Sequence, residues 1–198
     1  SDPYIISNST QFNNIKYRLS KDVKNNEYIF GTYDTNDNLQ LEDQKTIASA
    51  TKYFFKLNNH ITLTIDGEKN KNDTLNITNA TFNGNFNGDY YTITLNYNHI
   101  YDTTDFSSIS IFNTLGGNAV VENFKLYINI TTDEEKGVFY GGAASAYISA
   151  ICQQNDGTIS NINIGETGKT ITLKTNDLNV YFTFVTNKNN GTIKDVIN

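Results

Sequence analysis

The pattern of apolar and polar positions is organised around a short phrase that occurs three times. Each copy has an apolar residue, an Asn or Asp two positions later, and a second apolar residue directly after it. The copies lie at residues 121–124, 159–162 and 193–196. Because self-similarity at a spacing of a few tens of residues is typical of stacked repeats, the pattern predicts one structural unit repeated along an axis.

The spacing within the phrase is that of a strand that turns a corner. In a straight strand, side chains at positions i and i+3 point to opposite faces. A left-handed bend between them returns both apolar side chains to one interior, and Asn and Asp tolerate positive φ better than other non-glycine residues. We therefore expect Asn123, Asn161 and Asp195 to form an inward-turning ladder in successive coils of a parallel β-helix.

Near the N-terminus the apolar spacing changes to that of a helix. Asn8 and Gln11 have the spacing of a capping box, and they precede one apolar stripe. The stripe consists of Phe12, Ile15 and Leu19. Since an open stack of coils exposes its first layer, an amphipathic element is expected to cover it. We predict a helical cap at residues 1–24 and a β-helix with polar loop insertions at residues 25–198.

Two further strands are predicted around a tight turn, at residues 53–57 and 60–65. In the second strand, three apolar residues alternate with polar ones, as in a strand with one buried face. These residues are Ile61, Leu63 and Ile65. The following segment, 66–79, is polar and contains Asp-Gly and Asn-Asp, so it is predicted to be a surface loop.

Longer stretches around the phrase resemble a known repeat. Residues 150–162 read Ala-Ile-Cys-Gln-Gln-Asn-Asp-Gly-Thr-Ile-Ser-Asn-Ile and resemble the GLUG motif of bacterial surface proteins, which reads roughly Gly-Leu-Val-Gly-Tyr-Asn-x-Gly-Thr-Ile-x-Asn. Residues 184–196 match the second half of that motif but lack its first Gly pair, and residues 111–124 resemble a divergent opening copy. Residues 82–95 are similar to the Phe-x-Gly-x-Phe-Asp-Gly-x-x-x-Thr-Ile phrase that precedes such repeats.

This resemblance implies an all-β fold, namely a right-handed single-stranded parallel β-helix with an N-terminal helical cap. It also implies a secreted or surface-anchored bacterial protein, because such modules occur in adhesins, in large cell-wall repeat proteins and beside the catalytic part of IgA-specific metallopeptidases. The implied function is adhesion or ligand presentation toward a host or neighbouring-cell surface protein or glycan. Two alternatives stay open: a carbohydrate-active β-helix enzyme, either hydrolase or lyase, and a structural spacer or accessory domain of a surface protease.

The composition favours strands and tight turns and disfavours some partners. Of 198 residues, 13% are aromatic and 18% are charged. A net charge of −6 and a single arginine, Arg18, argue against nucleic acid, which requires clustered basic residues. No apolar run approaches the ~18 residues of a membrane span, so no membrane insertion is expected. With no signal peptide and no initiating Met, the chain is expected to be a mature or truncated piece of a larger protein.

Candidate chemical sites are weakly supported. His60 and His99 lack metal-ligand spacing, and residues 34–45 begin like a calcium loop but lack the Gly at position six and the Glu at position twelve. The acidic clusters at 102–105 and 133–135 fall in predicted loops, whereas acid–base catalysis needs carboxylates on rigid elements. We therefore predict no catalytic site, no cofactor and no metal, and we expect the single cysteine, Cys152, to be buried and inert.

Tyrosines are the candidate ligand contacts. Their side chains combine an apolar ring with a polar tip and supply contact surface at low entropic cost. The candidates are Tyr90, Tyr97, Tyr101, Tyr127 and Tyr140.

Overall fold

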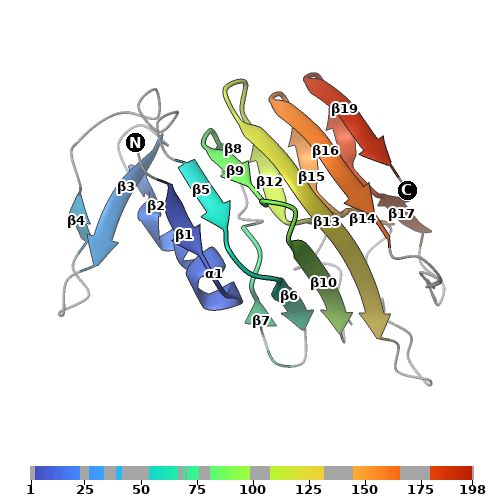
Figure 1. Ribbon diagram of the computed structural model, residues 1–198, viewed down its shortest axis with the longest axis horizontal. Helices are drawn as coiled ribbons and strands as arrows, with labels where there is room; N and C mark the ends of the chain where they lie inside the picture. Colours follow the sequence, from blue (N-terminus) through green and yellow to red (C-terminus); the bar gives the residue numbers. More distant parts are fainter. Residues whose placement is uncertain are drawn as a thin grey trace.

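The computed structural model is built almost entirely from β-strands (Figure 1), which confirms the predicted all-β class. The structure describes residues 3–22, 27–33, 39–41, 54–66, 69, 71–75, 81–98, 108–131, 145–165 and 179–197. Within these residues, no helix has the length and apolar character that crossing a membrane requires. From residue 54 onward, successive strands of the largest sheet lie side by side along the long axis of the molecule (Figure 1).

The largest sheet contains a row of parallel strands that were far apart in the sequence. This row consists of β1 (Tyr4–Ile6), β5 (Phe54–Leu57), β9 (Asn85–Asn87), β13 (Val120–Thr131), β16 (Thr158–Ile164) and β19 (Thr192–Ile197). Strand β13 is long enough to pair twice on one side. Its first part pairs with β9 and its second part with β10 (Thr92–Asn98), which pairs in turn with β6 (Ile61–Asp66).

Two smaller sheets are also parallel. One consists of β11 (Ser108–Ile109), β14 (Ser145–Ser149) and β17 (Asn179–Thr183), and the other of β8 (Thr81–Phe82), β12 (Phe112–Leu115), β15 (Cys152–Asn155) and β18 (Thr186–Asn189). Residues in equivalent positions of neighbouring strands, such as Asn155 and Asn189, are 34 residues apart in the sequence. The strands therefore recur at the interval that the repeated phrase predicts.

Some strands instead pair antiparallel. They are β2 (Leu19–Asp22), β3 (Glu27–Tyr33) and β4 (Leu39–Leu41), which form a separate sheet, and β7 (Lys71–Asn72), which pairs with the end of β6. Each antiparallel pair joins strands that are close in the sequence, where a short connection suffices. The largest sheet is therefore mixed, and β2, β3 and β4 lie outside the parallel rows.

The prediction of a surface loop at residues 66–79 was wrong for its middle part. After β7, residues 73–75 turn inward, and the Leu75 side chain is buried in the core. Asp73 is buried as well, and its carboxylate accepts a hydrogen bond from the Thr64 N–H (3.1 Å) and pairs with the Lys71 ammonium (3.1 Å). A buried charge needs such partners. Sequence reasoning missed this because a single apolar residue in a polar run gives no periodic signal.

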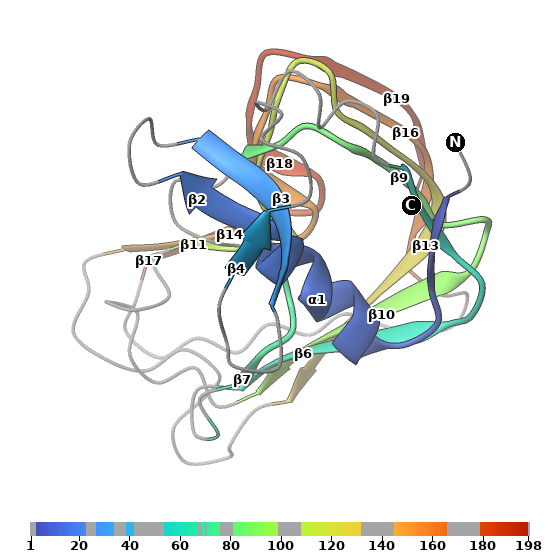
Figure 2. The ribbon, with the colours of Figure 1, turned by 90° about the vertical axis from the view of Figure 1, so that its left-hand side faces the viewer.

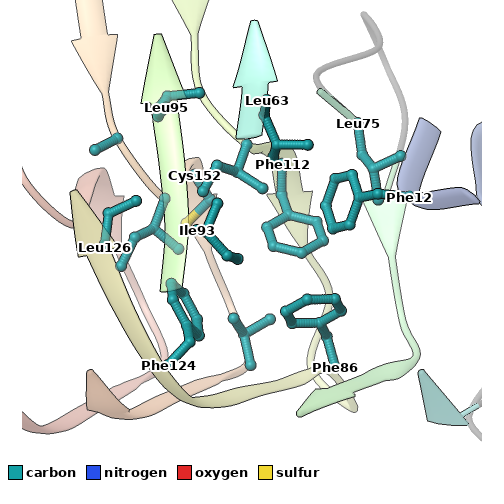
Figure 3. Packing of buried hydrophobic residues seen from close by; sticks show 14 of the residues in the cluster. Phe12, Leu63, Leu75, Phe86, Ile93, Leu95, Phe112, Phe124, Leu126 and Cys152 are labelled. Atoms are coloured by element: carbon teal, nitrogen blue, oxygen red, sulfur yellow. The ribbon is translucent and has the colours of Figure 1, made fainter. Parts of the chain in front are cut away.

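The core is formed by the inward faces of the strands. In β10, Ile93, Leu95 and Tyr97 are buried while the intervening residues are half-buried, which is the period-two alternation of a strand with one face in the core. Figure 3 shows aromatic side chains gathered at one end of this core, where Phe86 makes edge-to-face contacts with Phe12 (centroids 5.5 Å apart) and Phe112 (6.1 Å).

The helix α1 (Ser9–Arg18) covers the N-terminal end of the stacked strands (Figure 2). It begins as predicted, because the Asn8 Oδ1 accepts a hydrogen bond from the Gln11 N–H (2.9 Å) and the Gln11 Oε1 accepts one from the Ser7 N–H (2.6 Å). Phe12 and Ile15 are both buried against the core. The third residue of the predicted stripe, at position 19, begins β2 instead of continuing the helix.

Candidate binding surface at the left-handed corner

The Asn and Asp of the repeated phrase adopt the left-handed backbone that the spacing requires. Their φ angles are 60° at Asn123, 53° at Asn161 and 52° at Asp195. The three positions are aligned by the parallel pairing of β13 with β16 and of β16 with β19. The Asn161 Nδ2 donates a hydrogen bond to the Asn123 Oδ1 (2.6 Å). The apolar residues that flank the bend, such as Phe124 and Ile162, are buried.

The expected inward direction of this ladder was wrong. Asn161 and Asp195 are exposed, and Asn123 is half-buried. In the first two copies, the bend turns the apolar residues two positions before it and one position after it into the core, so the bent residue itself lies on the outer side of the corner. The amide ladder is therefore a surface feature.

A second asparagine pair exists at another corner, and one of its two members is buried. Asn155 is fully buried, its Oδ1 accepts a hydrogen bond from the Gly157 N–H (3.1 Å), and its Nδ2 donates one to the Asn189 Oδ1 (2.8 Å). In the sequence, Asn155 and Asn189 stand at the same distance before a Gly-Thr-Ile segment. That shared spacing is the signal that could have identified Asn155 as an inward residue, paired with Asn189 in the last row of strands, where Asn189 is exposed.

Next to β13 in the same sheet, the equivalent corner is enlarged into a turn between β9 and β10. The Tyr91 N–H donates a hydrogen bond to the Gly88 carbonyl (2.9 Å), and the two residues between them have φ angles of 47° (Asp89) and 63° (Tyr90). Two successive residues with positive φ define a type I′ turn. The Tyr90 N–H also donates a hydrogen bond to the Asn123 carbonyl (2.7 Å), so the turn is fixed to the neighbouring strand β13.

Tyr90 is an unusual residue for this place. The second central position of a type I′ turn favours Gly, and a bulky residue with positive φ costs of order 1–3 kcal/mol. Its side chain is 65% exposed, and its hydroxyl accepts a hydrogen bond from the Asn161 Nδ2 (3.3 Å). We call Asp89, Tyr90, Asn123, Asn161 and Asp195 together the corner surface.

Two carboxylates beside the turn are held by neighbouring side chains. The Asp89 carboxylate lies 3.1 Å from the Lys56 ammonium. The Glu122 carboxylate accepts a hydrogen bond from the Asn87 Nδ2 (3.3 Å). Besides these groups, the corner surface presents the aromatic ring, the amides of the ladder and the exposed Asp195 carboxylate.

The remaining candidate tyrosines are placed differently. Tyr97 cannot contact a ligand, because it occupies an inward position of β10 and is fully buried. Tyr127 is half-buried on the outward face of β13, between the buried Leu126 and Ile128. Tyr101 and Tyr140 lie outside the described residues.

Burial of Tyr97 leaves its hydroxyl without a hydrogen-bond partner among the residues that the structure describes, and it raises the pKa of Tyr97. An unpaired buried hydroxyl costs about 1–3 kcal/mol of desolvation. We therefore expect Tyr97→Phe to raise the free energy of unfolding by about 1 kcal/mol, measured by urea titration. A loss of stability would show that the hydroxyl has a partner in the folded protein.

Cys152 lies in the core at the start of β15, as predicted (Figure 3). Burial raises the pKa of its thiol to about 12. The reactive thiolate is therefore scarce at neutral pH. We expect iodoacetamide at pH 8 to leave the folded protein unlabelled and to label it fully in urea. Rapid labelling without urea would mean that the core opens readily at this coil.

The other candidate chemical groups are structural or lie outside the described residues. The His60 Nδ1 accepts a hydrogen bond from the Thr92 N–H (2.9 Å), and its ring packs edge-on against Tyr91. In the part of the chain that the structure describes, no three His, Cys, Asp or Glu residues gather as metal ligands would. His99 and the segments 34–38, 101–107 and 132–144, which hold the calcium-like and acidic stretches, are not described.

A scan against models of known protein families and searches of curated proteins and of solved structures find no match for this chain.

Proposed function

We propose that this chain is a non-catalytic module of a bacterial cell-surface or secreted protein, which binds a host or neighbouring-cell protein or glycan through the corner surface. The observation that carries the proposal is Tyr90, a largely exposed aromatic residue in a left-handed conformation. A sequence selected for stability alone would place Gly there. Residues in strained backbone conformations cluster at functional sites, where the strain contributes to binding or catalysis.

The proposed architecture is a right-handed single-stranded parallel β-helix with a helical cap. Three features support it: the parallel rows, the recurrence of equivalent residues after 34 or 38 positions, and the left-handed corner repeated at Asn123, Asn161 and Asp195. Stacked coils of this kind present a rigid outer surface, because each strand is held by its neighbours on both sides. A rigid scaffold suits recognition, since little order must be gained on binding.

The GLUG-like phrases support the surface location. They occur in the order expected of such modules, with the divergent copy first and the two similar copies after it. The matching Asn-x-Gly-Thr-Ile segments are followed in both cases by the left-handed residue, Asn161 or Asp195.

The test is a binding assay with a matched control. The purified chain is coupled to fluorescent beads and applied to epithelial cells and to bacterial cells. Tyr90→Gly removes the aromatic ring, and Asn187→Ala, an exposed substitution on the separate β18 ladder, is the control. We expect the original chain and the control to bind cells and Tyr90→Gly to lose most of that binding.

The same preparations are incubated with pectin, xylan, hyaluronan and mucin glycans, and reducing ends and unsaturated products are measured. Glycan cleavage that co-purifies with the protein would overturn the non-catalytic assignment and would favour a carbohydrate-active enzyme. Absence of binding to every cell type would favour a structural spacer.

A further inference from the structure

We propose that the Tyr90 ring is a preorganised platform on which a neutral saccharide stacks, with the asparagine ladder supplying hydrogen bonds to its hydroxyl groups. This inference rests on the proposed function and names the class of ligand for the corner surface. It depends on three observations: how the ring is held, what surrounds it, and which charges are already paired.

The Tyr90 side chain is anchored at both ends. Its backbone is fixed by the type I′ turn and by the hydrogen bond from its N–H to the Asn123 carbonyl (2.7 Å). Its hydroxyl is fixed by the Asn161 amide, which belongs to a coil beyond that of Asn123. The side chain therefore bridges successive coils while 65% of its surface stays accessible. An aromatic ring held in this way loses little freedom when a ligand packs on it.

The polar groups around the ring are those that bind sugar hydroxyls. The ladder amides carry both donor and acceptor atoms, and a hydroxyl is likewise both donor and acceptor. The Asn161 Nδ2 already bonds the Asn123 Oδ1 and the Tyr90 hydroxyl, so the Asn161 amide is held in one orientation. A saccharide ring has an apolar C–H face for the aromatic ring and hydroxyl groups at its edge for these amides.

The charged groups near Tyr90 and the net charge of the chain favour a neutral ligand. The carboxylate nearest to Tyr90 in the sequence, Asp89, is paired with Lys56. The net charge of −6 disfavours anionic ligands such as nucleic acids or sulfated glycans. A lysine-rich peptide is the competing class, since a cation can lie over a tyrosine ring. The exposed Lys125, two residues after Asn123 in β13, disfavours a cation beside Tyr90 and Asn123. The exposed Asp195 carboxylate lies one strand further along, beyond Asn161.

The experiment applies the full chain to printed neutral oligosaccharides of glucose, galactose, mannose and N-acetylglucosamine. Sulfated glycans and a lysine-rich peptide are printed beside them. The variants are Tyr90→Gly, Tyr90→Phe and Asn161→Ala, with Asn187→Ala as the control. Thermal unfolding of each variant is recorded in parallel.

We expect the original chain and the control to bind at least one neutral oligosaccharide series. Tyr90→Gly should weaken that binding at least ~10-fold without lowering the unfolding temperature, because Gly relieves the positive φ. Tyr90→Phe keeps the ring but loses its anchor, and Asn161→Ala loses the same anchor from the other side. Tyr90→Phe should therefore weaken binding by a smaller factor of roughly 2–5, and Asn161→Ala, which also removes a ladder amide that bonds the saccharide, should weaken it more than Tyr90→Phe does.

Two results would overturn the saccharide assignment. The first is saccharide binding by Tyr90→Gly equal to that of the original chain. The second is binding to cells or to the lysine-rich peptide that depends on Tyr90 while no neutral oligosaccharide is retained; the proposed function would then stand with a protein ligand. If neither cells nor saccharides are bound, the proposed function and this inference both fail.

Discussion

Gly157→Ala is expected to lower the free energy of unfolding by about 2–4 kcal/mol. A Cβ at this position would lie 2.6 Å from the Ala119 carbonyl oxygen and 2.6 Å from the Gly116 carbonyl oxygen. Both obstacles are backbone atoms, so no side chain can rotate away. The φ angle of Gly157 is not positive, and the constraint is therefore space rather than backbone conformation.

The clash falls where the segment around Gly157 is hydrogen-bonded to the chain on both sides. The Thr158 N–H donates a hydrogen bond to the same Ala119 carbonyl (2.9 Å), and the Thr192 N–H donates one to the Gly157 carbonyl (2.8 Å). Moving the backbone outward to admit a methyl group would strain both bonds. The loss of stability should therefore lower the urea midpoint of global unfolding, and it should not be confined to a local change near residue 157.

Gly117→Ala is the matched control for this prediction. Nothing lies within 4 Å of a Cβ built on Gly117, and its φ angle is not positive. Replacing Gly where Ala fits reduces the entropy of the unfolded chain and stabilises by about 0.4–1 kcal/mol. Urea denaturation of both variants, monitored by far-UV circular dichroism, gives the two values. Equal stabilities would contradict the close approach of the coils at Gly157.

The same close approach explains why the two best copies of the phrase share a glycine. A Cβ on Gly191 would collide with the backbone of Gly157, as one on Gly157 would with that of the coil before it. The Asn two residues before Gly157 is held inside by the Gly157 N–H. Two structural requirements therefore explain the Asn-x-Gly-Thr-Ile spacing. The Asn155 amide is buried, and the corner at Gly157 has no room for a side chain.

Two local features of the fold could be predicted from the sequence. The left-handed bend at Asn123 follows from the spacing of the apolar residues beside it, and the start of α1 follows from Asn8 and Gln11. The direction of the Asn123 side chain did not follow, because it depends on which side of the corner the core lies. Burial of Tyr97 was missed for a related reason, since a tyrosine in an alternating strand fits either face.

The corner surface could not be predicted as a unit. Tyr90 was one of several candidate tyrosines, and nothing near it in the sequence indicates that its hydroxyl meets Asn161, 71 residues later. That contact depends on the parallel register, which brings residues from successive coils together. The Asp-Tyr pair at a turn where Asp-Gly is usual becomes informative only once the turn type is known.

The second large effect is expected at the cap. Phe12→Ala should lower the free energy of unfolding by about 3–5 kcal/mol, the usual cost of truncating a buried Phe. Phe12 is fully buried and makes edge-to-face contacts with Phe86 (5.5 Å) and Phe112 (6.3 Å). These two residues belong to different strands of the stack, so one side chain fixes α1 to both (Figure 3).

Loosening of α1 should also change how the molecules associate. The helix covers the first layer of stacked strands (Figure 2), and an uncovered strand edge or apolar layer promotes pairing between chains. We therefore expect light scattering from Phe12→Ala to rise with protein concentration below its unfolding midpoint. Thr10→Ala, an exposed substitution on the same helix, is the control and should change neither stability nor scattering. A Phe12→Ala protein that stays monomeric and keeps its midpoint would show that the stack needs no cap, and the role assigned to α1 would be wrong.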